Sequence, residues 1–535
     1  MFSLSSMASV GGLIWQKCYG GTGNDSARSV SNTADGGFYV AGVTYSNDGN
    51  VTGNHNPTGN FSDVWIIKVD ATGNLVWQKT FGGVNADQAN SIATTTDGGA
   101  VICGWTNSSD GDASGLHGSA GGAADFWVIK LDNTGALQWQ KTLGGTKNDY
   151  GQSVKQTADG GYIVAGTTYS NDGDVTGNHD ASGATADFWV VKLDNTGAIT
   201  WQKTLGGTLQ EEGYSITQTT DLGYMVAGVA FSHDGNVSRT FNTSGTDAET
   251  WFVKLDASGT FVWQSAVGGS NADGAYSVVQ AKDGSYAAAG YTNSKDQNVS
   301  GNHDASGNTS DEWIVDVNST GSMTWQNCYG GSLNDVGHSI KQMTTGHFFV
   351  TGNVFSVNGN VTNGHDLSGS TQDLWTYELN SAGYLQWENS FGGSANDGGY
   401  DATETADSNF VEVGHTSSND GNVTGNHGGY DFWIIKVQSK EGAPFTTLGI
   451  ENVANGDDQL NVYPNPAHNY ATVMVNDNMI GQWIELTDMT GRVINEQQIT
   501  TGKFTMQTTG LANGVYLLRA GANGTGALVK KLVIN

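Results

Sequence analysis

The sequence predicts an all-β protein in which a seven-bladed β-propeller precedes an Ig-like β-sandwich. A Trp-Gln or Trp-Glu pair recurs seven times at a constant spacing of 62 residues. Each unit holds four short strand patterns separated by turn sequences, and a different strand pattern follows the last unit. We expect an N-terminal remnant over residues 1–12, the propeller over 13–437, a linker over 438–458 and the sandwich over 459–535.

The composition is that of a folded, acidic protein with a large core. Of 535 residues, 52 are Asp or Glu and 22 are Lys or Arg, which gives a formal charge of -30. This charge disfavours nucleic acid as a partner, and no apolar run approaches the ~18 residues needed for a transmembrane segment. The three cysteines show no pairing pattern, so we expect no disulfide scaffold.

Two tryptophan series define the repeat. The first advances by 62 residues without drift, and the second does the same until a last step of 58 residues. The first series is Trp15, Trp77, Trp139, Trp201, Trp263, Trp325 and Trp387. The second series is Trp65, Trp127, Trp189, Trp251, Trp313, Trp375 and Trp433.

One unit, residues 153–207, shows the four expected strands as SVKQT, YIVAGTT, DFWVVKL and AITWQKTL. In the third strand Trp189, Val191 and Leu193 share one face, whereas Phe188 and Val190 share the other. Apolar groups on both faces predict a sheet that is covered on both sides, as the stacked blades of a propeller are.

The phase of the repeat distinguishes a closed ring from an open solenoid. The chain begins inside a unit, with a lone fourth strand from Leu13 to Cys18, and the seventh unit stops after its third strand, from Phe432 to Val437. The first strand of the chain therefore completes the last blade. Such closure removes exposed sheet edges, and a solenoid would have no use for it.

Two sets of acids recur with the repeat. Paired carboxylates suit acid–base catalysis, but a feature built seven times is better explained by hydrogen bonding to turn N–H groups, so we predict a structural role. The first set is Asp25, Asp87, Asp149, Glu211, Asp273, Asp335 and Asp397. The second set is Asp63, Asp125, Asp187, Glu249, Asp311, Asp373 and Asp431.

The long loop between the second and third strands carries a candidate Ca²⁺ pattern. Oxygen-bearing side chains alternate before a Gly, as in the front half of a D-x-D-x-D-G calcium loop. The Glu that would close an EF-hand is absent, and Asp-Gly is also ordinary turn sequence, so calcium and plain turns are both open. We expect the six histidines in these loops to be polar side chains of the surface. The candidate calcium ligands are Asp110, Asp112, Ser114, Asp172, Asp174 and Thr176.

Departures from the repeat indicate where a ligand would contact the blades unequally. An aromatic residue near the start of the long loop recurs in most blades, and it would either stack on sugars or cover a blade interface. The candidate ligand-binding residues are Trp105, Tyr169, Arg239 and Phe241. Asp316 and Glu378 are irregular as well, because the other five blades hold Lys at that position.

From about Leu460 the sequence shows a compact set of alternating strands with landmarks in a fixed order. The landmark residues are Tyr463, Pro464, Asn465, Pro466, Asp488, Gly491, Arg492, Gly514, Tyr516, Lys530 and Lys531. They resemble, in the same order, the motifs of the type A C-terminal sorting domain of the type IX secretion system of Bacteroidota. The resemblance covers about the last 80 residues.

This resemblance implies export to the cell surface or the extracellular space, with the type IX translocon and its sorting peptidase as partners. The propeller is similar to repeat propellers that are carried as passengers on such domains. The first residues, MFSLSSMASVGG, do not resemble a signal peptide, which indicates either a displaced start or a protein that is not exported.

Three functions are open on this sequence. The leading hypothesis is a non-enzymatic module that binds a glycan or a protein through its long-loop face, because no nucleophile–base pair or nucleotide loop stands out from the repeat. The second is a glycan hydrolase or lyase that uses irregular acids of the central funnel, such as Glu211 or Glu212. The third is a purely structural surface module. Ca²⁺ is the one cofactor that the pattern suggests.

Overall fold

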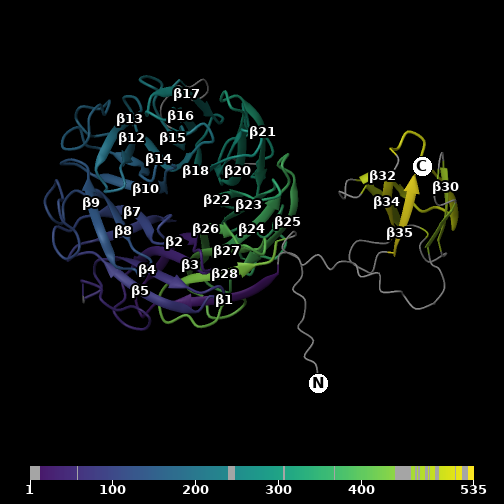
Figure 1. Cartoon of the computed structure of the whole chain (residues 1–535), viewed down its shortest axis with the longest axis horizontal. Coiled ribbons are helices and arrows are strands. Elements are labelled where there is room, and N and C mark those ends of the chain that lie inside the picture. Colours follow the sequence, from purple (N-terminus) through teal and green to yellow (C-terminus); the bar gives the residue numbers. More distant parts are fainter. Residues whose placement is uncertain are drawn as a thin grey trace. The chain divides into compact units, whose positions relative to one another are not determined.

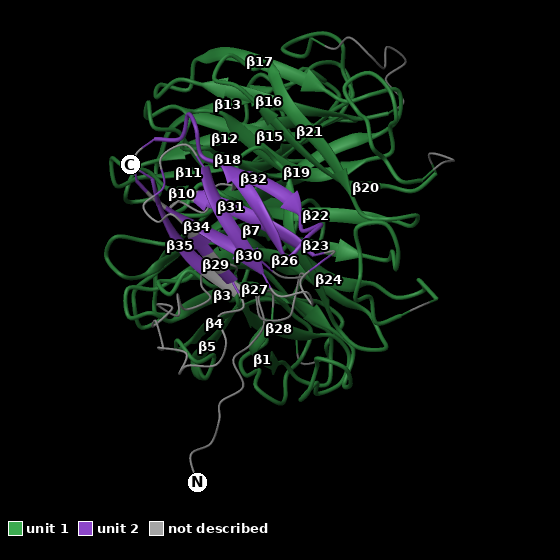
Figure 2. Ribbon diagram, turned by 90° about the vertical axis from the view of Figure 1, so that its right-hand side faces the viewer, with its two compact units in different colours: residues 1–445 green, residues 446–535 purple. Residues whose placement is uncertain are grey.

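The structure is a computed structural model that describes residues 12–439, except 57, 239–246, 305–307 and 367, and residues 460–534, except 464–466, 468–469, 476–479, 481, 489–492, 513 and 521–527. The chain divides into two compact units, Met1–Phe445 and Thr446–Asn535, which Figure 2 colours separately. Strands are the only regular elements of the described residues, and none of these residues belongs to a helix that could cross a membrane.

The first unit is a seven-bladed β-propeller, as the sequence predicts, and every blade is a four-stranded antiparallel sheet. In Figure 1 the first strand of each blade lies toward the centre of the ring and the fourth lies at the rim. Blades 1 to 3 are β2 (Asp25–Asn32), β3 (Phe38–Thr44), β4 (Asp63–Val69), β5 (Leu75–Phe81); β6 (Asp87–Thr94), β7 (Ala100–Thr106), β8 (Asp125–Leu131), β9 (Leu137–Leu143); and β10 (Asp149–Gln156), β11 (Tyr162–Thr168), β12 (Asp187–Leu193), β13 (Ile199–Leu205).

The remaining blades follow the same order, and the last one takes its rim strand from the start of the chain. Blades 4 and 5 are β14 (Glu211–Gln218), β15 (Tyr224–Ala230), β16 (Glu249–Leu255), β17 (Phe261–Val267); and β18 (Asp273–Gln280), β19 (Tyr286–Thr292), β20 (Asp311–Val317), β21 (Met323–Tyr329). Blades 6 and 7 are β22 (Asp335–Gln342), β23 (Phe348–Val354), β24 (Asp373–Leu379), β25 (Leu385–Phe391); and β26 (Asp397–Glu404), β27 (Phe410–Thr416), β28 (Asp431–Val437), β1 (Leu13–Tyr19).

Ring closure occurs through β1, and this prediction is confirmed. β1 pairs antiparallel with β28, so that Trp15 lies opposite Lys436 and Cys18 lies opposite Trp433. Ladder hydrogen bonds thus join the two ends of the propeller sequence. No edge is left for another chain to pair with at the point where an open array would expose one.

The core of the propeller lies between the blades. Trp189, in β12, is fully buried, and its ring packs against Phe126 of the preceding blade at 4.6 Å between centroids. The Trp189 indole donates to the Gln202 side chain at 2.8 Å, which explains why the repeat pairs this Trp with a Gln on the next strand. The ring of Phe126 lies over Gly166, where a Cβ would be 2.8 Å from Cζ and 2.0 Å from a backbone oxygen, so the second strand needs a glycine there.

The innermost strand is longer than the sequence pattern indicates. The alternation predicts a strand over residues 153–157, but β10 begins at Asp149. Its register shifts between Gly151 and Ser153 at a bulge, which interrupts the alternation of side chains. The inner strands of a propeller surround its central channel. The first acid of each repeat is therefore the first residue of the strand that lines this channel, and it is not part of the preceding turn.

The second unit is a β-sandwich, in agreement with the prediction. One sheet has the order β29-β30-β33 and the other β32-β31-β34-β35. Val473 and Met506 of the first sheet share a core with Ile484, Leu518 and Leu532 of the second. The strands are β29 (Leu460–Tyr463), β30 (Tyr470–Val475), β31 (Trp483–Asp488), β32 (Val493–Gln498), β33 (Lys503–Gln507), β34 (Gly514–Ala520) and β35 (Leu528–Ile534).

Several of the motif residues have a place in this sandwich. Tyr463 ends β29, Asp488 ends β31, Gly514 begins β34, and Lys530 and Lys531 lie on β35. The Tyr516 hydroxyl donates to the carbonyl of Ala512 at 2.9 Å, which fixes the entry to β34. Pro464, Asn465, Pro466, Gly491 and Arg492 lie outside the described residues.

Candidate functional site at the mouth of the central channel

The repeated acids at the start of the inner strands hold the long-loop face together. Asp149 accepts the Gly145 N–H at 2.9 Å and the Ser170 hydroxyl at 2.8 Å, and it also accepts the Thr168 hydroxyl. One carboxyl group thus links the inner strand, the turn before it and the start of the long loop. Burial raises the pKa of Asp149 to about 6, and these hydrogen bonds oppose the shift.

The second set of acids binds the loop histidines. His179 directs its backbone N–H and its Nδ1 toward Asp187 Oδ2, at 3.1 and 2.5 Å. Equivalent His–Asp contacts occur in five other blades, at 2.6–3.1 Å. Each histidine is therefore tied to its own blade, and the six do not gather around one ion. The other nitrogen of the imidazole reaches the neighbouring blade: His117 Nε2 lies 3.5 Å from Asp174 of the next blade.

The candidate calcium ligands cap the turns that precede the inner strands. Asp172 accepts the Thr146 N–H at 2.8 Å and the Thr146 hydroxyl at 2.7 Å, whereas Asp174 accepts the Gly144 N–H at 3.3 Å. Thr176 accepts from the Gln202 amide through its carbonyl, at 3.2 Å.

The same contacts recur in blade 2. Asp110 accepts the Val84 N–H at 3.0 Å, Asp112 the Gly82 N–H at 3.4 Å, and Ser114 the Gln140 amide at 2.5 Å. Among the described residues no group of three or more His, Cys, Asp or Glu side chains converges as a metal site. Calcium binding, which also draws on carbonyl and hydroxyl oxygens, stays a prediction.

The two charge reversals have a structural explanation. In blade 3, Lys192 pairs with Asp159 of the turn between the first two strands, at 2.9 Å. Blade 6 has Glu378 in place of this Lys, and its turn supplies His347, whose Nδ1 lies 2.6 Å from the carboxylate. In blade 5, Asp316 accepts the hydroxyl of Ser285 at 2.7 Å. Each turn therefore changes together with the strand residue that it contacts.

The sequence-predicted ligand residues have separate environments. Trp105 is half-buried at the end of β7, and its ring makes an edge contact with Tyr150 at 5.9 Å. Tyr169 is half-buried at the start of the blade 3 long loop. Arg239 and Phe241 lie outside the described residues, so a ligand site formed by these four stays a prediction.

An aromatic arc that the sequence analysis missed lines the channel. Tyr214, Tyr276, His338 and Tyr400 occupy the same register of β14, β18, β22 and β26, at steps of 62 residues. Successive ring centroids are 4.9, 5.4 and 5.0 Å apart. The signal in the sequence is this spacing of rings, and it applies to four blades only, because the same position holds Arg28, Asn90 and Gln152 in the others.

The arc ends in a pocket at the long-loop end of the channel, which we call the mouth pocket. Its volume is about 340 Å³ and its lining includes Arg28, Gln372, Tyr400, His415 and Tyr430. The guanidinium of Arg28 lies 4.3 Å from the centre of the Tyr400 ring. His415 is 4.6 Å from Tyr430 between ring centroids, and its Nε2 is 3.3 Å from the Gln372 amide.

The imidazoles of this region are held neutral at pH 7. Burial and, to a smaller extent, the nearby charge of Arg28 lower the pKa of His338 to about 4 and that of His415 to about 3. A neutral imidazole offers one N–H donor and one acceptor. The mouth pocket therefore combines one fixed cation with aromatic faces and uncharged hydrogen-bonding groups.

Glu212 connects the arc to the hydrolase hypothesis. Its carboxylate, at the second position of β14, accepts from the Tyr214 hydroxyl and the Gln210 amide. Glu211 points instead into the blade interior, where it is fully buried and accepts the Gly207 N–H at 2.8 Å. Of the two acids, Glu212 is the one that reaches the aromatic side chains of the channel.

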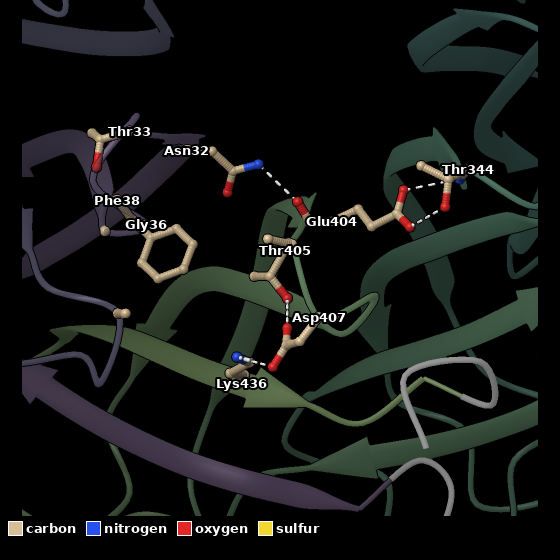
Figure 3. A pocket seen from close by; sticks show the side chains of 12 residues that line it. Asn32, Thr33, Gly36, Phe38, Thr344, Glu404, Thr405, Asp407 and Lys436 are labelled. Atoms are coloured by element: carbon tan, nitrogen blue, oxygen red, sulfur yellow. Dashed lines mark hydrogen bonds and ion pairs between the residues drawn. The ribbon is translucent and has the colours of Figure 1, made fainter. Parts of the chain in front are cut away.

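A second pocket, of about 500 Å³, lies at the short-turn end of the strands, between blades 7 and 1 (Figure 3). Its polar groups are engaged by the protein itself. Asp407 pairs with Lys436 at 2.7 Å, and Glu404 accepts the Thr344 N–H at 3.0 Å and the Thr344 hydroxyl at 2.9 Å. Since its charged groups already have partners, this pocket is a weaker candidate for a polar ligand than the mouth pocket.

Comparison with known families supports the prediction that the C-terminal unit is a sorting domain. Residues 461–535 match the family described as secretion system C-terminal sorting domain. The match confirms the sorting-domain resemblance and type IX secretion, and it implies export to the cell surface or the extracellular space. A sorting domain of this kind also implies interaction with the secretion machinery.

Similarities of the whole chain are weaker. It is 26% identical over 165 residues to the regulatory protein FlaEY of Caulobacter vibrioides, and the match covers 30% of this chain but only 17% of that protein. The Neurospora crassa Pan2 WD40 domain is 8% identical, with a TM-score of 0.40 and coverage of 78% of this chain and 89% of that one.

A further similar structure is PorZ of Porphyromonas gingivalis, described as a surface component of its type IX secretion system. It is 12% identical, with a TM-score of 0.28 and coverage of 95% of this chain and 70% of that one. The propeller assignment rests on the strand pairing of this structure itself.

Proposed function

We propose that this protein is an exported binding module whose propeller holds a carbohydrate at the mouth pocket. The observation that carries the proposal is the aromatic arc, a continuous set of rings that ends beside Arg28 and His415. The sorting domain delivers the propeller to its place of action through the type IX translocon, and we propose its removal by the sorting peptidase.

The chemistry of the arc suits a sugar. Aromatic side chains offer apolar faces to the C–H groups of a pyranose ring, and they lose little conformational entropy when they do so. Amide and imidazole groups, such as those of Gln372 and His415, supply the hydrogen bonds that fix sugar hydroxyls. A pocket of about 340 Å³ falls within the range of small-ligand sites.

The test is a binding screen of the full chain against glycans, with Tyr400→Ala and His338→Ala as variants. We expect at least a tenfold loss of affinity in both, because each removes a ring that would contact the sugar. Tyr384→Ala is the matched control, since Tyr384 is 66% exposed on a turn at the rim. Binding that survives both channel substitutions would contradict the proposal, and binding of a protein in place of any glycan would redirect it.

A second candidate is the glycan hydrolase or lyase, favoured by the contact of Glu212 with Tyr214 in the arc. It predicts release of reducing ends from a polysaccharide and loss of that activity in Glu212→Gln. A Glu211→Gln variant serves as the control, because Glu211 lies inside the blade. A chain that neither binds nor cleaves any glycan or protein would instead be the purely structural module.

A further inference from the structure

We infer that the mouth pocket selects a negatively charged sugar, with Arg28 binding its carboxylate or sulfate group. This inference rests on the proposed carbohydrate function and names the class of carbohydrate. It follows from the charge of the pocket, from the lack of an anionic partner for Arg28, and from the cations that line the channel behind it.

The mouth pocket differs in charge from the rest of the protein. The chain has 52 acidic residues and a formal charge of -30, yet neither Asp nor Glu is among the residues that line this pocket. Three other pockets of the described propeller do include carboxylates: Asp407 at the short-turn end, and Asp48 and Asp174 on the long-loop face. A local absence of acids in such a chain favours an anionic ligand at this point.

Arg28 has N–H donors that could bind an oxyanion, but no acceptor group in the described part of the chain receives them. Its Nε is buried without a hydrogen-bond partner, and within the described residues no carboxylate pairs with the guanidinium. By contrast, Lys68, Lys192 and Lys436 of the blades each have an Asp within 3.0 Å. The contact with Tyr400 provides no acceptor, so the planar fork of N–H groups is free to bind a carboxylate or a sulfate bidentately.

The channel behind the pocket adds positive charge. Lys155 is half-buried on β10, and burial together with the charge of Lys341 lowers its pKa to about 8. Lys341 itself pairs with Asp401 at 2.8 Å. Asp401 interacts with both lysines, so two positive charges face one negative charge on this part of the wall. The carboxylate of Glu212 contacts Tyr214, at the end of the arc away from Arg28. The excess of positive charge therefore lies toward Arg28 and favours an anionic ligand there.

The position of Arg28 next to the arc favours a charged sugar over a free anion. A carboxylate at C6 of a uronic acid, or a sulfate ester on a pyranose, places an oxyanion at the edge of a ring whose face remains apolar. Arg28 and Tyr400 present a cation and an aromatic face 4.3 Å apart, which matches both parts of such a sugar. Inorganic sulfate or acetate would use the cation alone.

The experiment measures binding of the full chain to acidic oligosaccharides and to neutral ones with the same linkage. The probes are oligomers of galacturonate, alginate and sulfated galactan, each compared with a neutral galactan or mannan. Three proteins are compared at constant ionic strength: the natural sequence, Arg28→Gln and Lys147→Gln. Arg28→Gln places in blade 1 the residue that blade 3 carries as Gln152 in the same register, so it is compatible with the strand. Lys147 is exposed on the same face and controls for net charge.

We expect at least one acidic oligomer to bind at least tenfold more tightly than its neutral counterpart. Arg28→Gln should lower that affinity at least tenfold, and Lys147→Gln should leave it within twofold. Sodium sulfate should compete with the acidic oligomer, and sodium acetate should compete less if the sulfate geometry is preferred.

Equal binding of acidic and neutral sugars, or acidic binding that Arg28→Gln does not weaken, would overturn this inference and leave the carbohydrate function in place. No binding of any sugar would overturn both. Binding of sodium sulfate without binding of any oligomer would show an anion site that does not recognise a sugar ring, and it would likewise overturn both.

Discussion

Blades 2 and 3 and blades 5 to 7 follow the same 62-residue repeat, but they fill their interiors differently. In blades 2 and 3 the positions between the sheets hold Phe126, Phe188 and Val164, all fully buried. In blades 5 and 7 the equivalent positions hold Glu312 and Glu412, also fully buried. The channel register changes on the same side of the ring, from Asn90 and Gln152 to the rings of the arc.

The buried acids carry an energetic cost that the regular blades avoid. Both carboxyl oxygens of Glu312 and of Glu412 are buried without a hydrogen-bond partner. Burial raises the pKa of Glu312 well above its usual range and that of Glu412 to about 8. The hydroxyls of Tyr377 near the first, and of Thr351 and Thr376 near the second, oppose the shift of the pKa, but none forms a hydrogen bond of good geometry with the carboxyl group. The comparison teaches that the regular blades act as a scaffold, whereas departures from the repeat concentrate beside the arc.

The largest effect should come from removing a core tryptophan in either region. Trp189→Ala in blade 3 and Trp375→Ala in blade 6 should each cost about 3–5 kcal/mol, because each leaves a large cavity between blades. Both side chains are fully buried, so we expect equal costs. Denaturant unfolding of the full chain measures this, with Trp483→Ala, 51% exposed in the second unit, as the control. A much smaller cost in blade 6 would show that the irregular blades are loosely packed.

The next effect should come from restoring an apolar residue in blade 7. Glu412→Val gives this blade the residue found at Val164 and Val350, and it should stabilise the propeller by about 1–4 kcal/mol by removing an unpaired buried carboxyl. Glu404→Gln is the matched control, because Gln156 and Gln342 occupy that position in other blades. Destabilisation by Glu412→Val would mean that the carboxyl group has a partner that it needs.

The same variant should flatten the pH dependence of stability. The pKa of Glu412 is about 8 in the folded state and about 4.5 in the unfolded state. The contribution of this group to the free energy of unfolding is therefore fully present below pH 4.5 and is lost as pH rises through 8. Over that window the natural protein should lose up to about 1.4 kcal/mol per pH unit relative to Glu412→Val. Parallel pH profiles for the two proteins would contradict this assignment.

A smaller effect concerns the reversed ion pair of blade 6. Glu378→Lys should destabilise the propeller by roughly 1–3 kcal/mol, since it places a Lys beside His347 and removes the acceptor of the Trp387 indole. Adding Thr345→Asp should recover most of the loss, because it recreates the Lys–Asp pair of the regular blades. Thermal unfolding of the single and double variants measures the coupling. Additive losses would show that the turn and the strand do not act as a pair.

The sequence was sufficient for the architecture because the period, the strand count and the phase each leave a pattern in residue order. Closure through β1 follows from a lone strand at one end and a missing one at the other, and pairing of Trp15 with Lys436 confirms it. The sorting domain was identifiable because its motifs keep a fixed order. These features depend on local sequence, and tertiary contacts do not alter them.

The arc was missed for a physical reason. Tyr276 and His338 are themselves the residues at the bulge of the inner strand, where the register passes from Ala275 to Ser277 and from Gly337 to Ser339, so simple alternation does not place them on the channel wall. Arg28 offers no local signal at all: its role depends on Tyr400 and His415, which belong to the last blade and reach it only through ring closure. Charge at one point of a closed ring is a property of the assembled blades.

The smallest expected effect concerns the long loops, where the regular blades share one design. Asp172→Ala should lower the unfolding midpoint of the metal-stripped chain by about 1–2 °C, since it removes the acceptor for Thr146. Asn358 fills the equivalent position in blade 6, with its side-chain oxygen 2.9 Å from the Ser332 N–H, so Asn358→Ala is a matched test of the turn alone.

Millimolar calcium distinguishes calcium sites from plain turns in these loops, because a ligand of the native state raises the midpoint in proportion to RT ln(1 + [L]/Kd). A calcium-dependent rise that is smaller in Asp172→Ala but unchanged in Asn358→Ala would make the acidic loops calcium sites, and it would add a second property that distinguishes the acidic loops from that of blade 6. The same midpoint with and without calcium would leave Asp172 and Asn358 with one role, the capping of a turn.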